Sequence, residues 1–507
     1  MMPRSLMLAA IATIGGTTPI IAQDRTLPSV PQSLALQEAL ELASQNSPVF
    51  RQSQNDRGPA AWGVRNALAS TFLPTLTASG GVGYSGAGSQ NFLTSSFVQA
   101  SGTLGSSYSL SLGWQFSGQT LSQPGLARAQ LAATDAQITG ARMGLRSGVV
   151  NQYLGVLQAQ DNVRITEAQQ KSTEEALRLA QARYQVGQTT VLDVRQAEVL
   201  KGRADVALIQ AQQAVTVEKL RLFQQMGVAA PVDPAVVSLS DTFPVVEPTW
   251  ALDQLLNEAE EGNPDLNALK ARHNAAVWNE RAVKSSWLPT FSLSARWSGY
   301  TQHFTDLDPV INNALVAAQQ EAEFNAEYCS WVNTNLVNPG ATGLPCPSAT
   351  VDTSLITQGI RDRNPTVALF NFGGYTRQPF QAQVGVSFPI FTQFSRPLRA
   401  AEAGAQADDA RELVRARNLQ VRTDVSQAHY GVQTAYRTIA IQETNRFAAQ
   451  EGLRLATEQY RVGSGTFLGV LDAQTVAQQA EADYVRAVYD YHRAIVLLET
   501  AVGRSLR

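Results

Sequence analysis

The stretch LRLAQARYQVGQTTVLDVRQA at 177–197 recurs as LRLATEQYRVGSGTFLGVLDA at 453–473. An ungapped alignment matches 11 of 21 positions and places Gly187 over Gly463, an offset of 276 residues. Each glycine ends an Ala-, Leu- and Arg-rich segment, and glycine readily adopts the left-handed conformation that terminates a helix. Thr190 and Thr466 then begin a new helix as N-caps, and Asp193 completes a capping box with Thr190. The repeated stretch therefore predicts the tips of two helical hairpins.

The helices on either side of these tips are expected to be very long. Four segments are rich in Ala, Gln, Leu, Arg and Glu and nearly free of proline, at about 124–186, 190–226, 397–462 and 466–502. At about 1.5 Å per residue, the longer member of each pair reaches roughly 90–100 Å. Such helices need neighbours along their whole length, as in coiled coils.

The repeat extends over the rest of the chain. SLALQEALELASQNSP at 33–48 corresponds to TWALDQLLNEAEEGNP at 249–264, and we expect Ser33 and Thr249 to cap these helices. A proline-rich linker at 228–248 separates the two copies. The sequence therefore predicts a first structural repeat at 23–227, the linker, and a second structural repeat at 249–507.

Each repeat also contains two segments in which apolar and polar residues alternate. These predicted strands cover 75–85, 107–117, 290–300 and 380–391. Alternation with period two gives one apolar and one polar face, and segments of about ten such residues are typical of transmembrane β-strands. Four strands are too few to close a barrel, and an open strand edge cannot lie in lipid. Two copies would supply eight strands and three would supply twelve, and the strand pattern alone does not choose.

The second repeat carries an insert at 301–380 between its strands, which we expect to be a surface loop, either an extracellular cap or decoration. It holds the only two cysteines, Cys329 and Cys346, whose spacing favours one disulfide in an oxidising compartment over two free thiols. Residues 1–22 have one arginine before an apolar run that ends at Ala22. This pattern predicts a signal peptide that is cleaved, in preference to the alternative of a short anchoring helix. The rest of the chain contains no run of about 18 apolar residues, so strands are the expected membrane-spanning elements.

Other chemistry is not indicated. A net charge of −3 with 16% charged residues gives no reason to expect a nucleic-acid partner. Gly81–Gly86 spells G-x-G-x-x-G, but it lies in a predicted strand with no helix after it. No metal spacing, catalytic motif or G-x-x-x-x-G-K-[ST] loop occurs, so we expect no cofactor, no metal and no ATP-driven activity. The four histidines are read as surface or helix-face residues: His273, His303, His429 and His492.

The duplicated tips, the LPT before a strand in both halves and FPIF at 388–391 resemble the TolC family of outer-membrane efflux ducts across the mature chain. The resemblance implies an α+β membrane protein in which duplicated strand hairpins and long helical hairpins form a homotrimer. Its twelve strands would make one β-barrel in the outer membrane, and its twelve long helices a periplasmic α-barrel. The duct would serve a tripartite efflux or type I secretion system through a periplasmic adaptor and an inner-membrane pump.

The resemblance also assigns roles at the tips. The pore gate would comprise Asp193, Asp472, Tyr184 and Tyr460, with three chains presenting a ring of six carboxylates. Tip turns that dock the adaptor would comprise Val186, Gly187, Thr190, Val462, Gly463 and Thr466. Gly465 and Gly469 stand where some relatives have Arg and Asp, from which we hypothesise a less tightly latched gate.

Simpler interpretations compete with these assignments. Asp193 can be a capping residue only, and the two tyrosines can be packing residues with a solvated hydroxyl. Asp472 lies one turn into its helix and has no capping role, which favours a role in the pore. The Ala- and Gln-rich hairpins alone would also suit a periplasmic coiled-coil adaptor or structural protein without a pore. The four alternating strands favour the duct, because a soluble adaptor has no need of two apolar hairpins.

Overall fold

The computed structural model describes residues 31–91, 97–336, 338, 340–364 and 375–506, and the expected signal peptide lies outside them. The chain divides into two compact units. The helical unit contains Ala127–Val277, Ala405–Arg507 and the chain up to Gly63. The sheet unit contains Val64–Leu126 and Trp278–Gly404.

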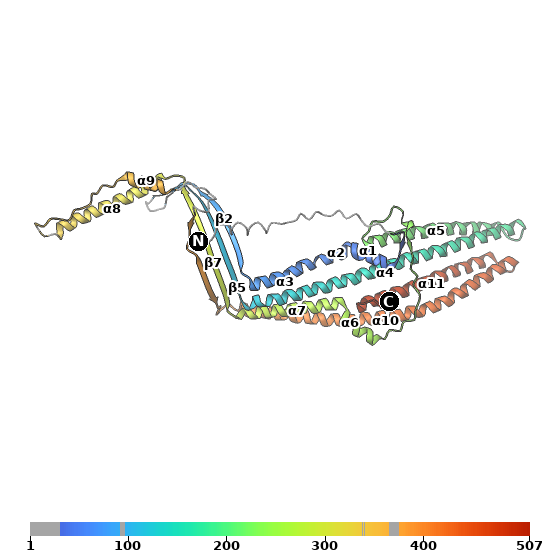
Figure 1. The fold of residues 1–507 in the computed structure, drawn as a ribbon. Coiled ribbons are helices and arrows are strands. Elements are labelled where there is room, and N and C mark those ends of the chain that lie inside the picture. The colour runs from blue at the N-terminus through green and yellow to red at the C-terminus, as the bar shows by residue number, and fades with distance from the viewer. Residues whose placement is uncertain (1–30, 92–96, 337, 339, 365–374, 507) are drawn as a thin grey trace. The chain divides into compact units, whose positions relative to one another are not determined.

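Helices make up most of the described chain (Figure 1). The helices are α1 (Leu36–Asn46), α2 (Pro48–Asn55), α3 (Arg57–Phe72), α4 (Gly118–Gln185), α5 (Val191–Met226), η1 (Pro234–Val236), α6 (Leu252–Gly262), α7 (Pro264–Lys284), η2 (Ser285–Trp287), α8 (Asp308–Asn335), α9 (Thr353–Arg363), α10 (Ser395–Val462) and α11 (Phe467–Val502). The strands are β1 (Ser33–Leu34), β2 (Thr75–Ser85), β3 (Gly88–Asn91), β4 (Phe97–Ala100), β5 (Thr103–Phe116), β6 (Ser238–Leu239), β7 (Thr290–Phe304), β8 (Thr376–Arg377) and β9 (Gln381–Ser387).

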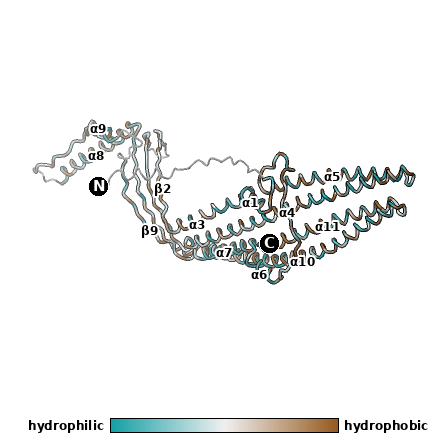
Figure 2. The backbone as a smooth tube through the Cα atoms, turned by 45° about the vertical axis from the view of Figure 1, so that its right-hand side comes forward, coloured by the Kyte–Doolittle hydropathy of each residue, from teal (hydrophilic) through white to brown (hydrophobic). Residues whose placement is uncertain are grey.

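Both repeats build hairpins of the same length. α4 and α10 each have 68 residues, and α5 and α11 each have 36. Figure 2 shows hydrophobic and hydrophilic residues interspersed along all four helices. Among the described residues, no helix is both long and apolar enough to cross a membrane.

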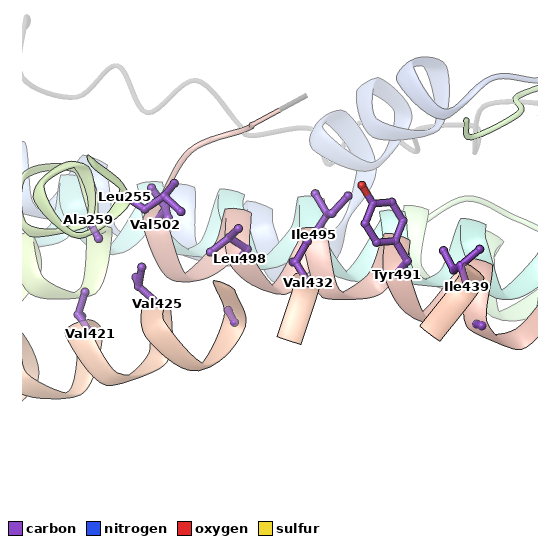
Figure 3. Close-up of a cluster of buried hydrophobic side chains, with 12 residues drawn as sticks. Leu255, Ala259, Val421, Val425, Val432, Ile439, Tyr491, Ile495, Leu498 and Val502 are labelled. Atoms are coloured by element: carbon purple, nitrogen blue, oxygen red, sulfur yellow. The ribbon is translucent and has the colours of Figure 1, made fainter. Parts of the chain in front are cut away.

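A short helix packs on each hairpin of the helical unit in the same way. Figure 3 shows Leu255 and Ala259 of α6 beside Val421 and Val425 of α10 and Val502 of α11. α1 supplies buried Ala39 and Ala43 to the equivalent cluster with α4 and α5, listed as Val149, Tyr153, Val156, Leu222, Phe223 and Met226. The expected caps of these short helices were wrong, because α1 and α6 begin later and have Ala35 and Ala251 at the N-cap.

The linker ties the two repeats together inside the helical unit. β1 and β6 pair in parallel, joining Ser33 to Ser238. Asp241 then accepts hydrogen bonds from the Leu36 backbone N–H (2.5 Å) and from the Tyr153 hydroxyl (3.1 Å). Burial raises the pKa of Tyr153, which therefore keeps its proton and remains a donor. α11 also packs against α4, where the Tyr489 hydroxyl donates to Asp161 at 2.6 Å.

The sheet unit contains an antiparallel sheet in the order β2-β5-β7, with β8 and β9 both paired to the far side of β7. Cross-strand partners point to the same face, so the side chains of one row of the ladder lie together on one face of the sheet. One face has apolar rows such as Leu76–Leu112–Ala295–Ala382. The other has polar rows such as Thr77–Ser111–Arg296–Gln381. The alternation read from the sequence thus gives two chemically distinct faces.

Three of the four predicted strands have other bounds in the structure, and β2 alone matches its prediction. β5 begins at Thr103 instead of 107 and β7 continues to Phe304 instead of 300, because these strands pair with each other over their whole shared length. β9 covers only Gln381–Ser387 of the predicted 380–391. It ends opposite Thr290, where β7 begins, and Pro389 has no N–H for a ladder bond.

The insert at 301–380 is not the loop that we expected. It contains α8 and α9, and the expected Cys329–Cys346 disulfide is present between α8 and the chain that follows it. The helical composition of 314–327, rich in Ala, Gln and Glu, explains α8. The prediction of a loop rested on the length of the insert and on its content of Asn, Pro and Gly.

Candidate functional site at the helical tips

The first tip turns within a few residues between α4 and α5. Gly187 has φ of +77°, and its N–H donates to the Tyr184 carbonyl at 3.0 Å. The Thr190 hydroxyl accepts from the Asp193 backbone N–H at 3.4 Å, and the Asp193 carboxylate accepts from the Thr190 N–H, which confirms the predicted capping box. The Thr189 hydroxyl also donates to Asp193.

The second tip repeats the turn but not the capping box. Gly463 has φ of +86° and donates to the Tyr460 carbonyl at 3.1 Å. Thr466 caps α11 by accepting from the Gly469 backbone N–H at 3.1 Å, and Gly469 has no side chain to return the bond. A Cβ on Gly465 would lie 3.0 Å from the Gln459 Cβ and 3.1 Å from the Tyr460 backbone nitrogen. A larger residue at 465 would therefore require the second turn to shift.

An arginine that the sequence analysis missed joins the two tips within the helical unit. The Arg183 guanidinium lies over the Tyr460 ring, 4.5 Å from its centroid, and donates to the Tyr460 carbonyl. Tyr460 is only 4% exposed and packs against Phe467, whereas Tyr184 is 49% exposed. Tyr184 and Tyr460 therefore occupy equivalent backbone positions in the repeat, but their side chains lie in different environments. The sequence feature that could have identified Arg183 is a mismatch in the repeat, because Arg183 aligns with Gln459.

The two predicted gate carboxylates also lie in different settings. Asp193 is half-buried and held by the threonines of the capping box. Asp472 is exposed, and it makes no hydrogen bond or ion pair with the part of the chain that the structure describes. Asp193 aligns with Gly469, and Asp472 lies three residues after Gly469 in α11. The two aspartates are therefore offset by about 4.5 Å along their helices. The two carboxylates therefore do not occupy equivalent positions in the two tips, and the ring of six carboxylates stays a prediction.

The tips also expose apolar side chains to solvent. Val186 and Val462 occupy equivalent positions before the two glycines and are 68% and 74% exposed. Leu192 and Leu468 are likewise equivalent and exposed in the first turn of α5 and α11. Paired exposed apolar residues at both tips are suited to contact with another protein.

The described residues offer no site for the other chemistry considered from the sequence. They contain no group of three or more His, Cys, Asp or Glu that could hold a metal ion. His429 contacts Gln433, and His492 contacts the Phe243 carbonyl at 3.2 Å. The G-x-G-x-x-G sequence begins inside β2, where a phosphate-binding helix start is not formed.

Comparison with known proteins agrees with this architecture. The family model described as outer membrane efflux protein matches residues 39–228 and 347–504. The outer membrane efflux protein BepC of Brucella suis is 24% identical over 74% of this chain and 68% of its own length. The outer membrane protein TolC of Vibrio cholerae is 24% identical over 73% of this chain and 70% of its own length.

Solved structures share the fold at low sequence identity. CusC is 16% identical with a TM-score of 0.68, covering 93% of this chain and 92% of its own. VceC of Vibrio cholerae is 18% identical with a TM-score of 0.66, covering 93% and 97%. The family match spans more than half of the residues, and the chain therefore belongs to the outer membrane efflux protein family: it is a TolC-like efflux channel of the outer membrane that extends into the periplasm, and not an enzyme.

Proposed function

We propose that three copies of this chain form a passive duct in which twelve strands close one β-barrel. The observation that carries the proposal is the sheet with two open edges, β2 and β9, one face of which is apolar. Unpaired backbone groups cannot lie in lipid, so each β2 edge requires a β9 edge from a neighbouring copy. Head-to-tail pairing of this kind closes a ring, and three copies of four strands make twelve.

The hairpins support a continuous periplasmic tunnel. Each copy supplies α4, α5, α10 and α11, so a trimer has twelve long helices whose tips all lie at the end of hairpins of equal length. The exposed valines and leucines of the tips are the proposed contact for a periplasmic adaptor. The chain has no phosphate-binding loop, so an inner-membrane pump would supply the energy in a tripartite efflux or type I secretion system.

The gate is proposed at the same tips. Asp472 is the candidate for cation selectivity, because its carboxylate is exposed and makes no hydrogen bond or ion pair with the described residues. Arg183 and Tyr460 are the candidates for holding the tips closed, because they connect the two hairpins of one copy. Asp193 is proposed mainly to stabilise the start of α5.

Planar-bilayer conductance of the purified protein tests this function. We expect discrete cation-selective steps, and we expect Asp472→Asn to lower the cation-to-anion permeability ratio severalfold. Asp490→Asn removes an exposed carboxylate elsewhere on α11 and should leave selectivity unchanged. A folded protein that never conducts would favour the coiled-coil adaptor without a pore. A conducting protein whose selectivity ignores Asp472 would remove that residue from the gate.

A further inference from the structure

The insert forms a braced arm beyond the ends of the strands in the sheet unit (Figure 1). We define the arm as α8, α9 and the return segment 340–352. The disulfide and paired hydrogen bonds between the Asn333 side chain and Leu344 backbone (2.8 and 2.9 Å) fasten its far part. At its base, the Asn364 amide donates to the Phe304 carbonyl and accepts from the Phe304 N–H, both at 2.9 Å. These bonds make the arm a defined structure that can present a surface.

Three aromatic side chains form a stripe along the outside of α8. Phe324, Tyr328 and Trp331 follow one another at helical spacing, with ring centroids 6.2 and 6.4 Å apart and planes within 9° and 18° of parallel. Their exposed fractions are 66%, 58% and 53%. Large aromatic residues so open to solvent are characteristic of binding surfaces. We call these three residues the aromatic stripe.

The arm's own bracing leaves the stripe open. Successive residues of a helix are rotated by about 100°, which places Cys329 and Asn333 on the side of α8 away from the stripe. Those two residues hold the return segment. The return segment is thus fastened to the opposite side of α8, and the stripe faces outward.

The charge around the stripe has one sign. Between Phe304 and Ile360 the sequence contains no Lys, Arg or His. Glu321 and Glu327 are exposed and lie about 60° to either side of the stripe on the helix, so carboxylates flank the aromatic rings on both sides. The electrostatic potential and the electron-rich ring faces both favour a cation.

We propose that the aromatic stripe and its flanking glutamates bind a basic polypeptide segment. Arg or Lys side chains would lie over the exposed ring faces and pair with Glu321 and Glu327, while apolar residues between them contact the ring edges. The same charge opposes an anionic polysaccharide and opposes a second arm, whose stripe carries identical carboxylates.

The test uses the full protein in nanodiscs of uncharged phosphatidylcholine, so that lipid does not attract the probe. The probe is a fluorescein-labelled octapeptide of alternating Arg and Leu, and anisotropy measures its affinity. The triple variant F324S/Y328S/W331S should weaken binding at least about tenfold, equivalent to ~1.4 kcal/mol. Glu321→Gln with Glu327→Gln should weaken it about threefold at low salt and flatten its salt dependence.

Matched controls lie on the same arm. Leu355→Ser removes an equally exposed apolar side chain from α9, and Asp362→Asn removes a carboxylate near its base, so neither should change the affinity. Tyr328→Phe keeps the ring and should retain binding. The proposal is overturned if the stripe variant binds as the wild type does, if the controls lose as much affinity, or if a Glu-Leu octapeptide or lipopolysaccharide oligosaccharide binds in place of the basic probe. It is also overturned if the stripe variant changes the oligomeric mass of the protein and leaves the affinity for the basic probe unchanged.

Discussion

At the scale of single residues, Arg183 connects the two halves of the repeat at their tips. It combines a cation–π interaction with a hydrogen bond to a backbone carbonyl, and both partners are provided by Tyr460. Buried contacts of this kind are worth on the order of 1–2 kcal/mol. A tie of this size would be strong enough to bias the tips towards the proposed closed state and weak enough to be released.

Arg183→Ala should open the tips, because it removes both interactions with Tyr460; it also removes the longer hydrogen bond from Arg183 to the Gln188 carbonyl of the first turn, at 3.5 Å. We expect the single-channel conductance to rise severalfold, measured beside the wild type in the same bilayers. Arg178→Ala is the control, since Arg178 pairs only with Glu174 of the same helix and is exposed. Equal conductance of the Arg183→Ala form and the wild type would show that the tie does not restrict the pore.

Asp241 is a second residue whose contacts join distant segments. Its carboxylate accepts from the first free N–H of α1 and from the Tyr153 hydroxyl, so Asp241→Ala leaves the part-buried Leu36 N–H without its acceptor, while the Tyr153 hydroxyl keeps the Leu34 carbonyl at 2.9 Å. The expected cost is about 1–3 kcal/mol. Hydrogen exchange of the 237–241 amides should accelerate accordingly, while Glu247→Gln, an exposed change in the same linker, should leave it unaltered.

At the scale of elements, the N-terminal capping boxes of α5 and α11 differ by one side chain. Asp193 closes the capping box of α5, and Gly469 leaves that of α11 half made. A Cβ at 469 would meet only the Thr466 hydroxyl, at an ordinary 3.5 Å. The second tip can therefore accept the residue that the first already has.

Gly469→Asp should stabilise the start of α11 by about 1 kcal/mol, from the capping box, the helix dipole and the loss of a flexible glycine. Slower hydrogen exchange of the 466–470 amides would report it, together with lower channel conductance if the glycine loosens the gate. Gly469→Ala separates the two contributions, since alanine gives the helix propensity without the carboxylate. Unchanged exchange in the aspartate form would contradict the assignment of a weaker second cap.

At the scale of the whole molecule, the pairing of β2 with β9 between copies is open to a direct test. Thr77→Cys combined with Gln381→Cys or Gln383→Cys places thiols on the polar faces of the two edge strands, in a Cys329→Ser/Cys346→Ser background. Oxidation should give covalently linked dimers and trimers on denaturing gels. Thr77→Cys with Ser298→Cys, on the inner strand β7, should give none. A pattern in which no edge pair cross-links would contradict head-to-tail closure.

Much of this architecture could be predicted from local patterns. Gly187, Gly463 and their following threonines specify turns through backbone geometry alone, and the alternation around Leu76 and Trp297 specifies two-faced strands. The contact between Arg183 and Tyr460 could not be predicted, because these residues are 277 positions apart in the chain and meet only through the packing of two hairpins. The helix in the insert could have been predicted, because 314–327 has a helical composition that the length of the insert obscured.

The absence of basic residues from 305–360, which covers the arm up to the last turn of α9, also bears on how the arm would withstand proteases. Trypsin-like proteases cut after Lys or Arg, and the sequence from Phe304 to Ile360 offers them no such bond. The disulfide would additionally keep the chain joined after a cut elsewhere between Cys329 and Cys346. An arm displayed at the bacterial surface would thus resist a major class of digestive enzymes through its composition, before any shielding by its fold.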